Sequence, residues 1–172
     1  PVVAVVGVLA AGSFLLLSNQ GAEPLVTSEI EQVEPSETYA QSFMDYYDKQ
    51  QAEVLHEKRH ALIQNDHFII VKDIINGETQ YHFAFGHYNA EQKKWEHQDH
   101  IVLTENYLPT LSKSSIGRGQ LIVGAIRNEQ VEAILVGDEE ATIVETKVGQ
   151  RLWYSIDNSY FTPVYEVLNG KK

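Results

Sequence analysis

Residues 67–85 read HFIIVKDIINGETQYHFAF and predict a β-hairpin. The first run, 67–73, is apolar and rich in β-branched residues, which favour strands. Asn76-Gly77 follows, and this dipeptide is the strongest short-range signal for a two-residue hairpin turn. Polar and apolar residues then alternate over 78–85. We therefore expect two antiparallel strands, the second of them buried on one face only.

Further short strands are predicted after the hairpin, and no β-α-β alternation is visible. They cover 95–103, 120–126, 131–136, 141–145, 151–156 and 163–168. An irregular connection rich in Ser, Pro and Gly is expected between the first two of these. The predicted fold class is α+β or mainly β, with one antiparallel, partly closed sheet of about seven short strands.

One amphipathic helix is predicted before the hairpin, over residues 37–64. Ser36 is its predicted N-cap, and Asn65 and Asp66 end it. Apolar side chains recur near helical spacing at Tyr39, Phe43, Tyr47, Val54 and Leu55. We expect this stripe to face the core.

The first stretch, 2–17, reads VVAVVGVLAAGSFLLL, and no charged residue precedes Glu23. Such a run near a chain end predicts a membrane span or a secretory signal. We favour a transmembrane signal-anchor at 1–18, in contact with the lipid bilayer through residues 2–17. A cleaved signal peptide and a buried helix are the alternatives.

Residues 19–36 are predicted to form an extracytoplasmic linker, because they contain two Pro and little hydrophobic mass. Between Glu23 and Asp48 there are seven acidic residues and no Lys or Arg. Positive charge is retained on the cytoplasmic side, so this flank is the one expected to cross. The predicted protein is single-pass in the cell membrane, with a single extracytoplasmic domain at 37–172 that is β-rich over 65–168.

Composition excludes some classes of function. The chain has no Cys, so it has no disulfide and no thiol chemistry. Its net charge of −11 offers no basic face to replace the counterions of a nucleic acid. We therefore expect no nucleic-acid partner.

Residues 56–60 fit the H-E-x-x-H pattern of zinc hydrolases. On a helix, His56 and His60 would share one face and reach one zinc ion, with Glu57 as general base. A third ligand would come from Glu78, Glu91 or His82. Lys58 and Arg59 fill the middle positions, which are usually uncharged in a buried zincin helix. We therefore favour an exposed charged helix turn, without cofactor.

All seven histidines lie between residues 56 and 100, and His97-Gln98-Asp99-His100 is a second plausible chelate. Three interpretations stay open. The histidines bind a metal without catalysis, they sense pH, since His titrates near neutrality, or they are simply polar residues of strands and turns.

The C-terminal third is aromatic. Trp153, Tyr154, Tyr160 and Phe161 are the candidate binding residues, because Trp and Tyr are favoured at interaction surfaces. They are equally favoured in strands, and we expect Trp153 to lie in the core rather than at an interface.

Three segments carry a resemblance: 124–134 (GAIRNEQVEAI), 140–144 (EATIV) and 151–154 (RLWY). Over residues 65–168 the chain resembles small exported β-domain proteins of Bacillus-type Firmicutes, anchored by an N-terminal helix or a lipid. The resemblance implies a cell-envelope location and brings no catalytic motif. A lipid-anchored member would carry a lipobox Cys, which this chain does not have.

The leading hypothesis is a membrane-anchored extracytoplasmic domain of the bacterial cell envelope that binds an envelope protein or a small ligand. The alternative is a zinc-dependent hydrolase that uses His56, Glu57 and His60.

Overall fold

The computed structural model describes residues 35–49, 51–116, 119–157 and 162–168. The predicted signal-anchor at 1–18, its bilayer contact and linker residues 19–34 lie outside these ranges. In the described part of the chain, no helix is both long and apolar enough to cross a membrane. All described residues belong to one unit, Val33–Lys172.

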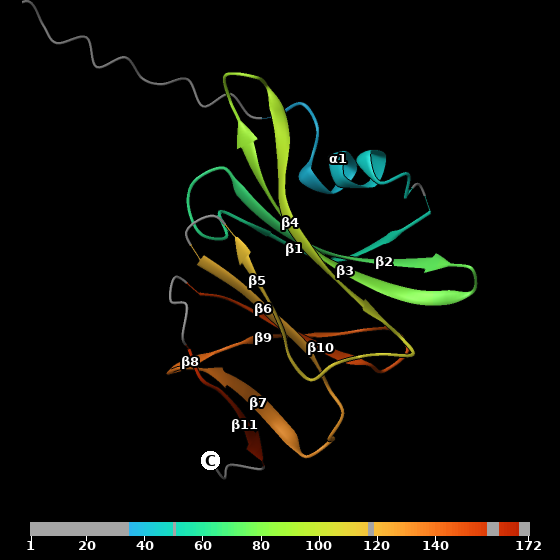
Figure 1. Cartoon of the computed structure of the whole chain (residues 1–172), viewed down its shortest axis with the longest axis vertical. Helices are drawn as coiled ribbons and strands as arrows, with labels where there is room; N and C mark the ends of the chain where they lie inside the picture. The colour runs from blue at the N-terminus through green and yellow to red at the C-terminus, as the bar shows by residue number, and fades with distance from the viewer. Residues whose placement is uncertain (1–34, 50, 117–118, 158–161, 169–172) are drawn as a thin grey trace, which may run out of the picture. The chain divides into compact units, whose positions relative to one another are not determined.

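Within these ranges the chain forms one helix, α1 (Tyr39–Tyr46), and three antiparallel sheets (Figure 1). In spatial order, sheet A holds β1 (Glu53–Arg59), β2 (Asp66–Ile75), β3 (Glu78–Asn89) and β4 (Lys94–Thr104). Sheet B holds β5 (Ser112–Ile116), β6 (Gly119–Ile126), β10 (Arg151–Asp157) and β9 (Thr142–Glu145). Sheet C holds β11 (Val164–Leu168), β7 (Val131–Val136) and β8 (Glu139–Glu140).

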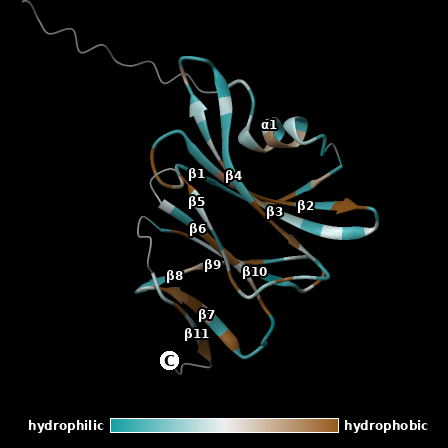
Figure 2. Ribbon diagram, in the orientation of Figure 1, coloured by the Kyte–Doolittle hydropathy of each residue, from teal (hydrophilic) through white to brown (hydrophobic). Residues whose placement is uncertain are grey.

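The mainly β, antiparallel class is thus confirmed, and the prediction of one partly closed sheet is wrong. Three buried clusters explain the difference, because each joins two layers. The first joins sheets A and B, the second joins α1 and sheet A, and the third joins sheets B and C. The layers therefore follow in the order α1, sheet A, sheet B, sheet C. Figure 2 shows the hydrophobic residues mainly on strands and the hydrophilic ones at turns.

The hairpin of β2 and β3 is confirmed. Ile75 pairs with Glu78, so Asn76 and Gly77 form the two-residue turn. Their φ angles of 53° and 81° lie in the left-handed region that such a turn requires. The alternation along β3 is also present, with Phe83 on the face toward sheet B.

The expectation that β3 is buried on one face only is wrong. Tyr81, Phe83 and Phe85 pack in the cluster shared with sheet B, while Ala84 packs in the cluster under α1. Both faces are covered because sheet A lies between two layers. His82, on the α1 side, is consequently only 3% exposed.

The predicted helix at 37–64 is wrong beyond its first third. α1 begins after Thr38, whose side-chain oxygen accepts a hydrogen bond from the Gln41 N–H at 3.2 Å, so Ser36 is not the N-cap. The helix ends at Tyr46, and Asp48 turns the chain with a φ of 53°. Residues 53–59 then pair with β2, which satisfies their backbone groups without a helix.

The other predicted strands are confirmed, with ends shifted by a few residues at most. Prediction missed β5 inside the expected irregular connection, and it missed the two-residue β8. β5 reads SKSSI and is polar except for Ile116. Its side chains carry no strand signal, and its backbone pairing with β6 makes it a strand.

Candidate functional site

Three histidines and one phenylalanine meet on the face of sheet A that α1 covers. His82 lies on β3, His97 and His100 lie on β4, and Phe43 lies on α1. The centroid of the Phe43 ring is 6.0 Å from that of His82, 6.1 Å from His97 and 6.0 Å from His100. Phe43 therefore sits among three imidazoles, and we call these four side chains the histidine cluster.

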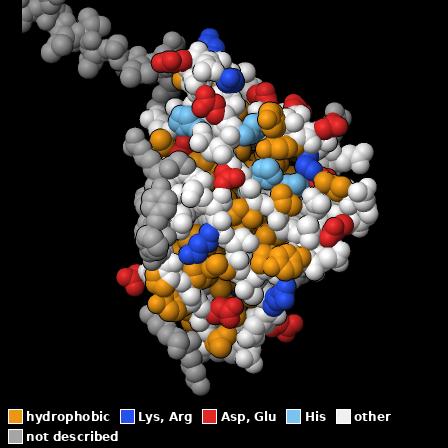
Figure 3. All heavy atoms as spheres, viewed as in Figure 1, with side chains coloured by type: hydrophobic (Ala, Val, Ile, Leu, Met, Phe, Trp, Pro, Cys, Tyr) orange, Lys and Arg blue, Asp and Glu red, His pale blue; other side chains and the backbone are white. Residues whose placement is uncertain are grey.

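A β-bulge brings His97 and His100 to the same face. Residues three apart on a regular strand point to opposite faces of a sheet. Here the register between β3 and β4 shifts between Phe85 and Gly86, which leaves Gln98 as an extra residue. Both imidazoles can then face α1. Figure 3 shows histidine side chains gathered beside hydrophobic ones in the upper half of this view.

Tyrosines at the end of α1 cover the cluster from the solvent side. The Tyr46 ring lies 4.6 Å from that of His97, and the Tyr47 ring lies 4.9 Å from that of His100. The Tyr47 hydroxyl is 3.3 Å from His100 Nδ1. Tyr46 nevertheless stays 69% exposed, so one edge of the cluster reaches the surface.

The polar atoms of the cluster are poorly satisfied. Within the described part of the chain, neither ring nitrogen of His82 has a hydrogen-bond partner, and His97 Nδ1 has none either. A buried polar group without a partner costs about 1–3 kcal/mol. An apolar side chain would avoid this cost at His82, so stability alone does not account for an imidazole there.

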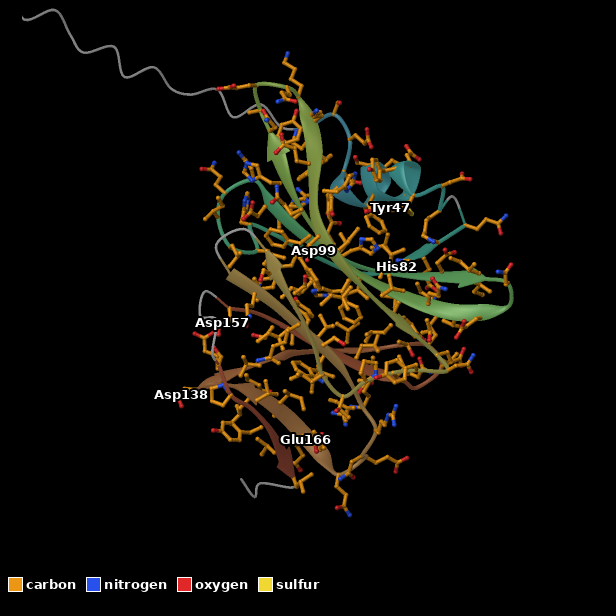
Figure 4. The ribbon with its side chains drawn as sticks, in the orientation of Figure 1. Tyr47, His82, Asp99, Asp138, Asp157 and Glu166 are labelled. Carbon is orange, nitrogen blue, oxygen red and sulfur yellow. The ribbon has the colours of Figure 1, made fainter. Side chains whose placement is uncertain are left out.

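An ion pair lies at the edge of the cluster. Lys49 Nζ and Asp73 Oδ2 are 2.6 Å apart, and both side chains are nearly buried. Figure 4 shows His82 near Tyr47 on this side of sheet A. The pKa of His82 is lowered from 6.5 to about 4, chiefly by burial and also by the positive charges of Lys49 and His100, while Asp73 opposes the shift.

The other two imidazoles also resist protonation. Burial lowers the pKa of His97, and so does the neighbouring His100. Burial lowers the pKa of His100 against the opposing charge of Asp99. Asp99 accepts hydrogen bonds from the His100 backbone N–H at 2.7 Å and from the hydroxyl of Ser114 on β5. At neutral pH the cluster is therefore a set of neutral imidazoles in an apolar setting.

The H-E-x-x-H residues are not brought together. They lie on and just after a strand, where neighbours such as His56 and Glu57 point to opposite faces. His56 Nε2 is 2.7 Å from the Tyr154 hydroxyl, on the sheet B side. Glu57 lies 3.6 Å from His67. His60 follows β1 with a φ of 52°, and its Nδ1 accepts a hydrogen bond from the Asn65 N–H.

The three suggested third ligands are equally scattered. Glu78 begins β3, Glu91 lies in the turn before β4, and His82 faces α1, away from His56. Among the residues that the structure describes, no group of three or more His, Asp or Glu side chains is placed to hold a metal ion. The hydrolase alternative stays a prediction, without the helical geometry on which it was based.

The aromatic candidates of the C-terminal third divide in two. Trp153 and Tyr154 are 1% and 2% exposed, in the clusters toward sheets C and A respectively. They are core residues, as expected for Trp153, and offer no free surface. Tyr160 and Phe161 lie outside the described residues.

A shallow depression of about 310 Å³ lies at one end of sheet B. Two arginines line it. Arg127 donates a hydrogen bond to the Leu108 carbonyl at 2.6 Å, and Arg151 donates one to the Val131 carbonyl at 2.7 Å. Because both guanidiniums hold backbone carbonyls, we assign them a structural role.

Sequence reasoning identified the histidine-rich region but missed its organisation. Phe43 was expected to face the core, and Lys49 and Asp73 were not singled out. The count of seven histidines within 56–100 was the available signal. Comparison of the chain with protein-family models, curated proteins and solved structures gave no match.

Proposed function

We propose that the chain is a membrane-anchored extracytoplasmic domain of the cell envelope and that it binds a partner with the surface around Tyr46 and the histidine cluster. One observation carries the proposal of a binding surface. Tyr46 is 69% exposed, yet its ring is held at 4.6 Å from His97 and 4.8 Å from Tyr47. An exposed but held tyrosine offers a large contact area at a low entropic cost.

The proposed location rests on the sequence. The apolar stretch 2–17 and the acidic flank without Lys or Arg that follows it are typical of an outward-facing anchored domain. Because the chain has no Cys, a single introduced thiol can report which side of the membrane the domain occupies.

The test of location uses Val148→Cys, at a position that is 64% exposed, in intact cells treated with a membrane-impermeant maleimide. We expect labelling without lysis. Ile122→Cys is the matched control, because Ile122 is fully buried and should react only after denaturation. Labelling of Val148→Cys only after lysis would overturn the proposed location.

The test of the surface compares two tyrosines of nearly equal exposure. A photo-crosslinking amino acid replaces Tyr46, which is 69% exposed, or Tyr107, which is 71% exposed. We expect a discrete crosslinked product in cells from position 46 and none from position 107. Equal products from both positions, or none from position 46, would contradict the assignment of this surface.

A further inference from the structure

We propose that the histidine cluster is a proton-operated latch, which holds α1 on sheet A while its imidazoles are neutral and releases α1 when they are protonated. The inference goes beyond the proposed binding function and does not depend on the location of the domain. It rests on the position of Phe43, which enters the cluster from α1 at 6.0–6.1 Å from all three imidazole rings.

The latch holds a short element. α1 has eight residues, of which only Tyr39, Ala40 and Phe43 are buried. A helix of two turns has little stability of its own, so its packing on sheet A keeps it in place. The packing at Phe43 is therefore the point at which a change in the cluster acts on the whole helix.

Protonation opposes this packing because the cluster lacks free counter-charges among the described residues. The groups that face it are Tyr39, Tyr46, Tyr47 and Lys49 from α1 and the turn after it, Asp73 from β2, and Asp99 from β4. Asp73 already pairs with Lys49, and Asp99 already accepts two hydrogen bonds. Added protons would place like charges on rings only 6.0 Å apart, as between His82 and His100.

Release of α1 hydrates the imidazolium ions and relieves this repulsion. A single Phe43 ring offers them only weak cation–π attraction in exchange. The cost of release is exposure of the apolar face of sheet A, where Ile69, Val71 and Ala84 are now fully buried. Acid would thus convert a covered face of sheet A into an open one while the A–B core stays closed.

The experiment measures how accessible the inner face of α1 is at each pH. Ala40→Cys places a single thiol on the buried side of α1, where Ala40 is 7% exposed. Gln41→Cys places a single thiol at the adjacent position, on the exposed side of α1. The full chain, purified in detergent with a chelator, reacts with a disulfide reagent that works at acid pH, such as dithiodipyridine. The ratio of the two rates cancels the pH dependence of the thiol.

We expect the ratio of the position-40 rate to the position-41 rate to rise at least tenfold between pH 7.5 and pH 4.5. The rise should disappear when His82→Leu, His97→Gln and His100→Gln are combined. His60→Gln is the matched control, because His60 is exposed and lies outside the cluster, and it should keep the rise.

Circular dichroism of the same samples reports whether the sheets stay folded. The proposal is overturned if the ratio stays flat in the parent chain, if it rises equally in the triple variant, or if the sheet signal is lost over the same pH range. If the triple variant fails to fold, the same rate ratio is measured in His82→Leu alone. An unchanged rise of the ratio in that variant overturns the proposal.

Discussion

The two faces of sheet A bury their side chains by different means. Toward sheet B, Phe68, Phe83 and Leu103 pack in an apolar cluster, and the histidine on that side, His56, has a partner in the Tyr154 hydroxyl. Toward α1, His82 is more deeply buried than the half-buried His56, and neither of its ring nitrogens has a hydrogen-bond partner among the described residues. One residue type thus has its polar atoms satisfied on one face and unsatisfied on the other. The first face holds the domain together, and the second can respond to protons.

The largest effect on stability is expected from a matched pair of substitutions, one on each face of sheet A. Phe83→Ala should lower the free energy of unfolding by about 3–5 kcal/mol, because it opens a cavity in the core between two sheets. Phe43→Ala should lower it less, because α1 can detach while the sheets stay folded. Urea denaturation followed by circular dichroism measures both. Equal losses would show that α1 belongs to the same cooperative core.

A pH titration of stability addresses the α1 face alone. His82 has a folded-state pKa of about 4 against 6.5 in the unfolded chain. As the pH falls, the unfolded chain therefore binds the proton first, and stability is lost between pH 6.5 and pH 4. The expected loss from this residue is of the order of 3 kcal/mol. Urea denaturation at a series of pH values should show a smaller loss in His82→Leu, whereas an identical pH dependence would refute the assignment.

Gly86→Ala tests how closely α1 packs on β3. A Cβ atom at Gly86 would lie 2.2–2.8 Å from three atoms of the Tyr39 ring. We expect a loss of about 1–3 kcal/mol from this overpacking. Thermal unfolding measures it, and Tyr39→Leu combined with Gly86→Ala should lose less than the sum of the two single variants. If the losses of the two single variants simply add, the new Cβ atom at position 86 does not clash with the Tyr39 ring.

The smallest effect is expected on the face toward sheet B. Tyr154→Phe removes the hydroxyl that lies 2.7 Å from His56 Nε2 and keeps the ring that packs on Phe68 at 4.3 Å. The expected loss is about 1 kcal/mol, which is typical of one hydrogen bond. Urea denaturation at pH 7.5 measures it. No loss at all would show that the contact between His56 and the Tyr154 hydroxyl contributes no stability. The contrast in hydrogen bonding between the two faces would then have no energetic consequence.

Prediction from sequence succeeded where the signal is local. The hairpin of β2 and β3 has its turn dipeptide and its alternation within twenty residues, and most other strands have β-branched runs. It failed at β1 and β5, whose own side-chain patterns do not indicate a strand and whose conformation is decided by backbone pairing with the next strand, β2 or β6. Val54 and Leu55 continue the near-helical spacing of the apolar residues in 39–47, yet residues 53–59 pair with β2. For the site, prediction found the region but not the bulge at Gln98 that turns His97 and His100 to one face.

The sequence by itself determined the antiparallel hairpin, the mainly β class and the concentration of seven histidines within residues 56–100. These follow from side-chain periodicity, turn chemistry and composition, which act over short distances along the chain. Only the tertiary structure decided that sheet A is covered on both faces and that Phe43 lies among three imidazoles. Burial and pKa depend on what packs against a residue from far along the chain, and no local pattern contains that information.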